Sequence, residues 1–197
     1  MWIGLCGLTV PILMCLFLLM AISQAPWWSI TNNSLSRLAG TIGDRPYWSA
    51  TGAPAIILNF GLILCGTLMI VFSTGLWSSD VFHNGIGKLG KTLYIGASVM
   101  LFAIGVFPLT VGPFHYVVSY SFFSLAPISM LLMGVSAIQS GKGIDHKMGY
   151  VFVVMAISGA VPFMVMWPWS GLAIPEILAI IPQVRFSAVV GYELMVG

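Results

Sequence analysis

Six long apolar stretches alternate with short polar ones along the chain, at residues 3–25, 54–77, 92–111, 114–138, 148–167 and 172–192. Apolar residues run continuously within each stretch, whereas a membrane β-strand would alternate polar and apolar positions with a period of two. Each stretch is long enough to cross a hydrocarbon layer ~30 Å thick as a helix rising ~1.5 Å per residue. The pattern therefore predicts an all-α, polytopic transmembrane bundle of six helices.

The third and fourth stretches are separated only by a short segment that contains Gly112 and Pro113. Proline cannot continue a helix, and the residue before it is biased away from helical geometry. We therefore expect a tight helical hairpin here and not one long span. No linker, internal repeat or low-complexity segment interrupts the chain, so residues 1–197 are expected to form a single integral membrane domain.

Composition strengthens the membrane assignment. Of the 197 residues, 59% are hydrophobic and 6% are charged, and the mean hydropathy is +1.03. A soluble domain carries about 25% charged residues. The composition excludes a soluble domain, a disordered chain and a nucleic-acid binder with a basic face. A multi-pass protein of the cell membrane is expected.

Loop charge predicts the orientation, because cytoplasmic loops are enriched in Lys and Arg. The loops at 78–91 and 139–147 lie on the same side of a six-span bundle and carry four lysines: Lys88, Lys91, Lys142 and Lys147. That side, with both chain termini, is predicted to be cytoplasmic. The long loop at 26–52 between the first two spans is then extracytoplasmic, although it carries Arg37 and Arg45.

Ionisable groups inside a span are costly and often mark function. Glu176 follows Pro175 about five residues into the sixth stretch, roughly 8 Å deep at ~1.5 Å per residue. One interpretation is a first-turn acid near the headgroups, favoured there by the helix dipole. The other is a buried acid with a partner or a function. Gln183 lies on roughly the same face, and Arg185 is close enough to the inner end to extend toward the headgroups.

Other polar residues share the predicted depth of Glu176. His115 opens the fourth stretch and forms an i, i+4 pair with Ser119. His115 is interpreted either as a hydrogen-bonded interfacial residue or as a proton-handling group, and Asn59 as a hydrogen bond between helices. The outer loop could fold over these residues through Ser36, Arg37, Asp44 and Arg45. The candidate outer polar cluster comprises Glu176, His115, Ser119, Asn59, Ser36 and Arg37.

The sequence contains no recognisable set of residues that would bind a metal or a cofactor. A haem held by two histidines needs two facing membrane histidines, and only His115 qualifies, because His83 and His146 lie in loops. A di-metal site needs more carboxylates than the spans contain. Zinc spacing is absent, and the three cysteines (Cys6, Cys15 and Cys65) are interpreted as small apolar packing residues. No cofactor and no metal are expected.

Short motifs resemble a known family. The sequence Ser-Leu-Ser-Arg-Leu-Ala-Gly at 34–40 follows the first span, and Gly-Val-Phe-Pro at 105–108 ends the third, ahead of His115. Ile-Pro-Glu at 174–176 opens the sixth. The chain resembles the six-span prokaryotic membrane family catalogued as domain of unknown function number 998, itself similar to the Frag1/DRAM/Sfk1 group. The resemblance implies the fold and membrane location but no activity, and Ile-Pro-Glu looks closest to archaeal members. Family members often carry an acid after the proline, where this chain has Leu109 and Thr110.

Two functional hypotheses follow. The first is a non-enzymatic accessory or scaffold subunit, or a lipid-interacting component, of a membrane complex with other subunits or further copies of itself. The second is an intramembrane enzyme or a protein that binds a small molecule, such as a lipid or quinone, at the outer polar residues around Glu176 and His115. No spacing of nucleophile, base and orienting residue is legible in the sequence, so a non-enzymatic role is the expectation.

Overall fold

The structure is a computed structural model that describes residues 1–40, 52–140 and 144–196. Six helices in this part of the chain are long and apolar enough to span a membrane. They are α1 (Trp2–Ser23), α2 (Ala53–Trp77), α3 (Gly85–Val106), α4 (Pro113–Ser140), α5 (His146–Ala160) and α6 (Ala173–Val196). Short 3-10 turns lie at η1 (Leu35–Arg37), η3 (Leu109–Val111) and η4 (Val161–Phe163), the last extending α5. The predicted all-α bundle of six helices is confirmed.

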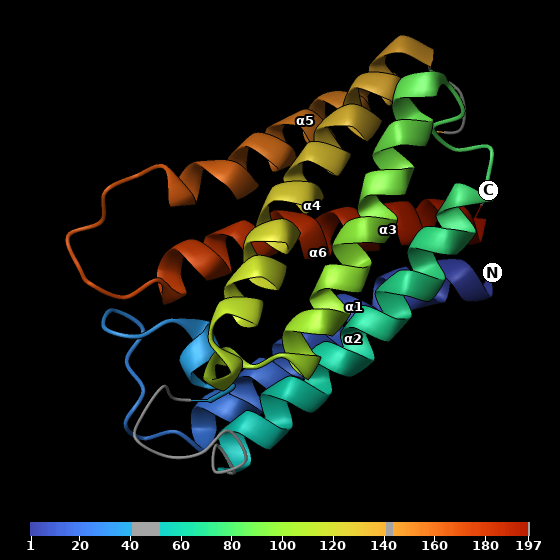
Figure 1. Ribbon diagram of the computed structural model, residues 1–197. Coiled ribbons are helices and arrows are strands. Elements are labelled where there is room, and N and C mark those ends of the chain that lie inside the picture. The colour runs from blue at the N-terminus through green and yellow to red at the C-terminus, as the bar shows by residue number, and fades with distance from the viewer. Residues whose placement is uncertain (41–51, 141–143, 197) are drawn as a thin grey trace.

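The helices form a closed ring. Each long helix contacts the next along the chain, and α6 returns to contact α1. Successive helices run in opposite directions, so both chain ends lie at the same end of the bundle (Figure 1). The ring surrounds a central space to which several helices contribute side chains.

The two ends of the bundle are filled differently. Towards the end that holds the termini, aromatic side chains from α2, α3, α5 and α6 pack edge-to-face: Phe72, Tyr94, Phe152 and Phe186. All four are buried. Aromatic pairs in this geometry contribute about 0.5–1.5 kcal/mol each beyond the area they bury. At the opposite end, residues 24–40 cover the helices, and a cavity lies beneath them.

The third helix begins seven residues earlier than the sequence predicted, at Gly85 instead of position 92. Asn84 explains this start, because its side chain caps the helix by accepting a hydrogen bond from the Gly87 N–H at 2.8 Å. Lys88 and Lys91 therefore belong to α3 and not to a loop.

The prediction that Lys91 lies in a loop is wrong. Its side chain is buried in the bundle and only 2% exposed. Its ammonium group donates to three main-chain carbonyl oxygens at the end of α2 and just beyond it, those of Trp77 (3.2 Å), Ser79 (3.0 Å) and Val81 (2.9 Å). These groups include carbonyls that the helix end leaves without partners. Lys91 thus joins α3 to the end of α2.

The turn between α3 and α4 matches the predicted hairpin. The chain leaves α3 at Phe107-Pro108, passes through η3 and reverses at Gly112, whose φ of 68° is a conformation that favours glycine. Pro113 then opens α4, where its missing N–H is no loss. This reversal returns the chain beside the end of α3.

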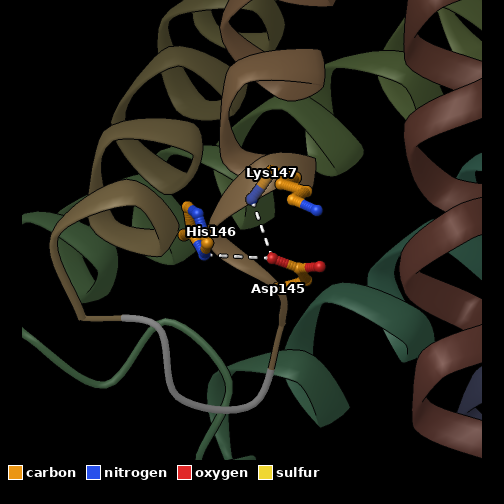
Figure 2. Close-up of polar contacts among 3 residues, drawn as sticks. All are labelled: Asp145, His146 and Lys147. Atoms are coloured by element: carbon orange, nitrogen blue, oxygen red, sulfur yellow. Dashed lines mark hydrogen bonds and ion pairs between the residues drawn. The ribbon is translucent and has the colours of Figure 1, made fainter.

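Asp145 caps the start of α5, at the end of the bundle that holds the termini (Figure 2). The Asp145 carboxylate accepts from the Lys147 N–H at 3.0 Å and lies 3.1 Å from His146 Nδ1. The side chains of Asp145 and His146 are both 58% exposed. His146 therefore belongs to a local, exposed cap at the surface of the protein.

Candidate functional site

The segment between α1 and η1 folds over the end of the bundle opposite the termini and joins the start of α6. Main-chain N–H groups of Gly171 and Ala173 donate to the carbonyls of Thr31 (2.8 Å) and Asn33 (3.0 Å). Apolar side chains under the loop include Leu35 and Leu38, which pack with residues of α1, α2 and α6. The loop is therefore a fixed part of the bundle at this point, and it presents η1 to the interior.

Glu176 holds η1 in place. It lies in the first turn of α6 and is 8% exposed. Its Oε2 accepts a hydrogen bond from the Leu35 N–H at 2.5 Å, and the Ser36 side chain lies close enough to interact with the same carboxyl group. The acid thus has a buried protein partner, which the first-turn interpretation alone does not require.

His115 lies opposite, in the first turn of α4, and is 2% exposed. Its Nδ1 lies 2.8 Å from the Phe107 carbonyl oxygen, and its Nε2 lies 3.0 Å from Ser36 Oγ and 3.3 Å from Ser119 Oγ. A carbonyl oxygen only accepts, so Nδ1 carries a proton. In the neutral ring Nε2 is then the acceptor for a hydroxyl group.

The structure brings together four of the six residues in the predicted cluster. Glu176, Ser36, His115 and Ser119 form one connected set of contacts, which we call the outer polar site. Asn59 lies nearby, but its Nδ2 donates to the Ala39 carbonyl at 3.0 Å, so it holds the loop instead of joining two helices.

Arg37 and Arg185 stay apart from the outer polar site. Arg37 follows Ser36 in η1 but its side chain is exposed. Asp44 and Arg45, which were expected to fold over the cluster, lie outside the described residues. Arg185 is exposed on the outside of α6.

The outer polar site forms one wall of an interior cavity of about 170 Å³. Side chains from α1, α2, α3, α4, α6 and η1 line it, and most are apolar, including Val10, Met14, Leu58, Leu62, Ile104 and Ile180. An engineered apolar cavity of ~150 Å³ binds benzene. The space is therefore large enough for a ring-sized molecule.

Gln183 supplies a further polar group to the cavity, two turns along α6 from Glu176. It is 6% exposed and lines the cavity, and its Nε2 has no hydrogen-bond partner among the described residues. A buried donor without a partner costs about 1–3 kcal/mol and calls for an explanation. Rotation of the terminal amide would turn this donor toward the cavity, where a hydrogen-bond acceptor would satisfy it.

The outer polar site provides an imidazole base, two hydroxyl groups and a carboxyl group beside an apolar space. Within residues 1–40, 52–140 and 144–196, no three His, Cys, Asp or Glu side chains lie close enough together to hold a metal ion. The available chemistry is hydrogen bonding and proton transfer by His115 and Glu176.

Sequence reasoning missed two main-chain groups that orient the site, the Leu35 N–H and the Phe107 carbonyl. A signal for the second was present. Helix α3 ends just before the Phe107-Pro108 pair, and the last carbonyls of a helix lack partners within it. A histidine eight residues further on, after a glycine turn, could be expected to return to such a carbonyl.

These features define a multi-pass, six-helix membrane protein with a buried polar site at one end of a central cavity. Residues 8–192 match the family described as a protein of unknown function, DUF998, and the chain belongs to this family. No curated protein and no solved structure matches the chain.

Proposed function

We propose that this protein binds a small, uncharged molecule, mostly apolar with one hydroxyl or carbonyl oxygen, in the central cavity. The observation that carries the proposal is a mostly apolar cavity of about 170 Å³ with the amide of Gln183 in its wall, whose Nε2 has no hydrogen-bond partner among the described residues. With the amide turned toward the cavity, an oxygen on the ligand would accept a hydrogen bond from Nε2. The apolar remainder of the ligand would fill space that is otherwise lined by aliphatic side chains.

Charge and size define the ligand class. The cavity lining contains no Lys or Arg and only one acid, Glu176, which already accepts from Leu35. A charged ligand would lose its hydration without gaining an opposite charge that is free to pair with it. A volume of about 170 Å³ holds a ring or a short alkyl segment, and a two-chain phospholipid is too large to enter whole.

The location of the site fits a ligand that arrives through the membrane. If the loop charges predict the orientation correctly, the outer polar site faces the extracytoplasmic side of the cell membrane. Small amphiphiles partition into that interface, so they would reach the cavity at high local concentration. The alternative of an accessory subunit stays a prediction, because apolar outer side chains suit lipid and partner helices equally well.

A binding measurement with 4-fluorophenol tests the proposal. The purified protein in lipid nanodiscs is titrated, and the fluorine NMR signal of the probe is followed against empty nanodiscs. We expect saturable binding that Gln183→Leu weakens about tenfold, equivalent to ~1.4 kcal/mol. Leu62→Trp, which fills the cavity, should abolish it. Ile56→Trp is the matched control, since Ile56 lies on the same helix but is 63% exposed on its outer face.

The variants must give the monodisperse elution profile of the wild type before their binding is compared. If Gln183→Leu and Leu62→Trp both bind the probe as tightly as the wild type, the probe lies outside the cavity and the proposal is overturned. Absence of saturable binding to the wild type would overturn it as well.

A further inference from the structure

Ser36, His115 and Phe107 form an arrangement with a chemical use beyond binding. The Phe107 carbonyl fixes the proton on Nδ1 of His115, so Nε2 of the neutral ring faces Ser36 Oγ at 3.0 Å as an acceptor. A hydroxyl next to a base whose other side is held by a third group is the general pattern of an activated nucleophile. The three residues come from η1, the start of α4 and the end of α3, so only the fold assembles them.

The main chain on the N-terminal side of Ser36 is held firmly. Glu176 accepts from the Leu35 N–H at 2.5 Å, and the Trp28 indole N–H donates to the Ser34 carbonyl at 3.0 Å. Both contacts restrict the position of the Ser36 hydroxyl relative to His115. A nucleophile placed in this way needs little reorganisation to react.

Ser36 and His115 both line the cavity. A molecule in the cavity therefore lies beside the Ser36 side chain while the histidine remains buried. Ser119 also lies beside Nε2, but at 3.3 Å, and it is part of the same helix as His115. Ser36 is the closer hydroxyl to the base.

We propose that Ser36 is the nucleophile of an acyl-transfer reaction on an uncharged ester whose apolar part occupies the cavity, a proposal that rests on the function proposed above. Ser36 Oγ bonds to the ester carbonyl carbon while His115 Nε2 takes the hydroxyl proton. The carbon–oxygen bond of the ester breaks, and the departing oxygen takes that proton and leaves as an alcohol.

Water completes the cycle without any redox change. It adds to the acyl group on Ser36 and gives a proton to His115 Nε2. The bond to Ser36 breaks, a carboxylic acid is released, and the proton returns to Ser36. Glu176 acts in this scheme as a positioning residue, because it holds the Leu35 main chain next to the nucleophile.

A fluorophosphonate probe, which phosphonylates activated serines, tests the proposal on the full chain in nanodiscs. Peptide mass spectrometry should locate the label on Ser36, and Ser36→Ala should lose it. His115→Gln should slow labelling about 100-fold, since general bases contribute typically 10²–10⁴. Ser34→Ala, which keeps the Ser34 carbonyl that accepts from Trp28, is the matched control and should label at close to the wild-type rate.

Labelling and 4-fluorophenol binding are measured on the same preparations. Binding without label on Ser36 would overturn the nucleophile and leave the proposed cavity function intact. Label on Ser36 without binding would overturn the proposed ligand class and retain an activated serine. Label that persists unchanged in His115→Gln would overturn the role of His115 as the base, and with it the proposal.

Discussion

Lys91 shows how strongly one polar side chain can be tied to the packing of a membrane protein. Its aliphatic stem is buried, and its ammonium group satisfies three carbonyl oxygens at 2.9–3.2 Å. It also lies 5.8 Å from the centroid of the Trp77 ring, within the range of a cation–π interaction. A lysine that the sequence assigns to a solvated loop is thus a structural cation.

Replacing Lys91 by methionine should therefore destabilise the fold. Methionine fills similar space but donates no hydrogen bond, so carbonyl oxygens at the end of α2 lose their partner. The expected cost is about 1–3 kcal/mol, measured as a lower midpoint of thermal unfolding in detergent. Lys88→Met, one turn earlier on the exposed side of α3, is the control and should unfold at the wild-type midpoint. Equal midpoints for both variants would contradict a structural role for Lys91.

At the residue scale, the sequence could identify polar groups but not their partners. Glu176 and His115 stand out because ionisable residues are rare in these spans. Their contacts depend on Ser36, which is 79 positions from His115, and on main-chain groups of Leu35 and Phe107. Such distant pairings follow from helix packing and loop folding, and a single sequence carries no direct record of them.

At the scale of elements, the contact between α4 and α5 depends on the close approach of two glycines. A Cβ on Gly134 would lie 2.9 Å from the Gly149 carbonyl oxygen, and one on Gly149 would lie 2.7 Å from that of Gly134. Both distances are too short for an unchanged backbone. Small residues that let two helix backbones approach are a common means of packing in membranes.

Gly134→Ala or Gly149→Ala should push α4 and α5 apart and destabilise the protein by about 1–3 kcal/mol, the usual cost of overpacking. Thermal unfolding in detergent measures the effect. Gly96→Ala is the matched control in α3, where the nearest side-chain atom, Leu125 Cδ1, is 3.5 Å from the new methyl group. It should be neutral or slightly stabilising, because alanine favours a helix by up to ~1 kcal/mol over glycine. Losses of equal size at positions 96, 134 and 149 would contradict the packing argument.

Helix number and type were predictable because long apolar runs in a membrane can satisfy their backbone only as helices. The residues at which helices begin and end were less predictable. Hydropathy placed the start of the third helix at position 92, whereas capping by Asn84 moves it to Gly85. The segment 85–91 is rich in glycine and lysine and reads as a loop by hydropathy. The Asn84 cap, packing against α4 and the hydrogen bonds of Lys91 to the end of α2 together explain why it is helical.

At the scale of the whole molecule, the ring of six helices places the termini at one end and the outer polar site at the other. Membrane orientation therefore determines which side of the membrane supplies the ligand. The lysines at the termini end predict that this end is cytoplasmic. Arg37 and Arg45 in the outer loop oppose that prediction, so a direct measurement matters.

Cysteine labelling in intact cells tests the orientation. In a background with Cys6, Cys15 and Cys65 replaced, Asn32→Cys should react with a membrane-impermeant maleimide, because Asn32 is exposed in the outer loop. His146→Cys, at the opposite end and also exposed, should react only after permeabilisation. The reverse labelling order would place the outer polar site at the cytoplasmic face. A ligand or ester would then have to come from the inner leaflet or the cytoplasm, and the water in the proposed reaction would be cytoplasmic.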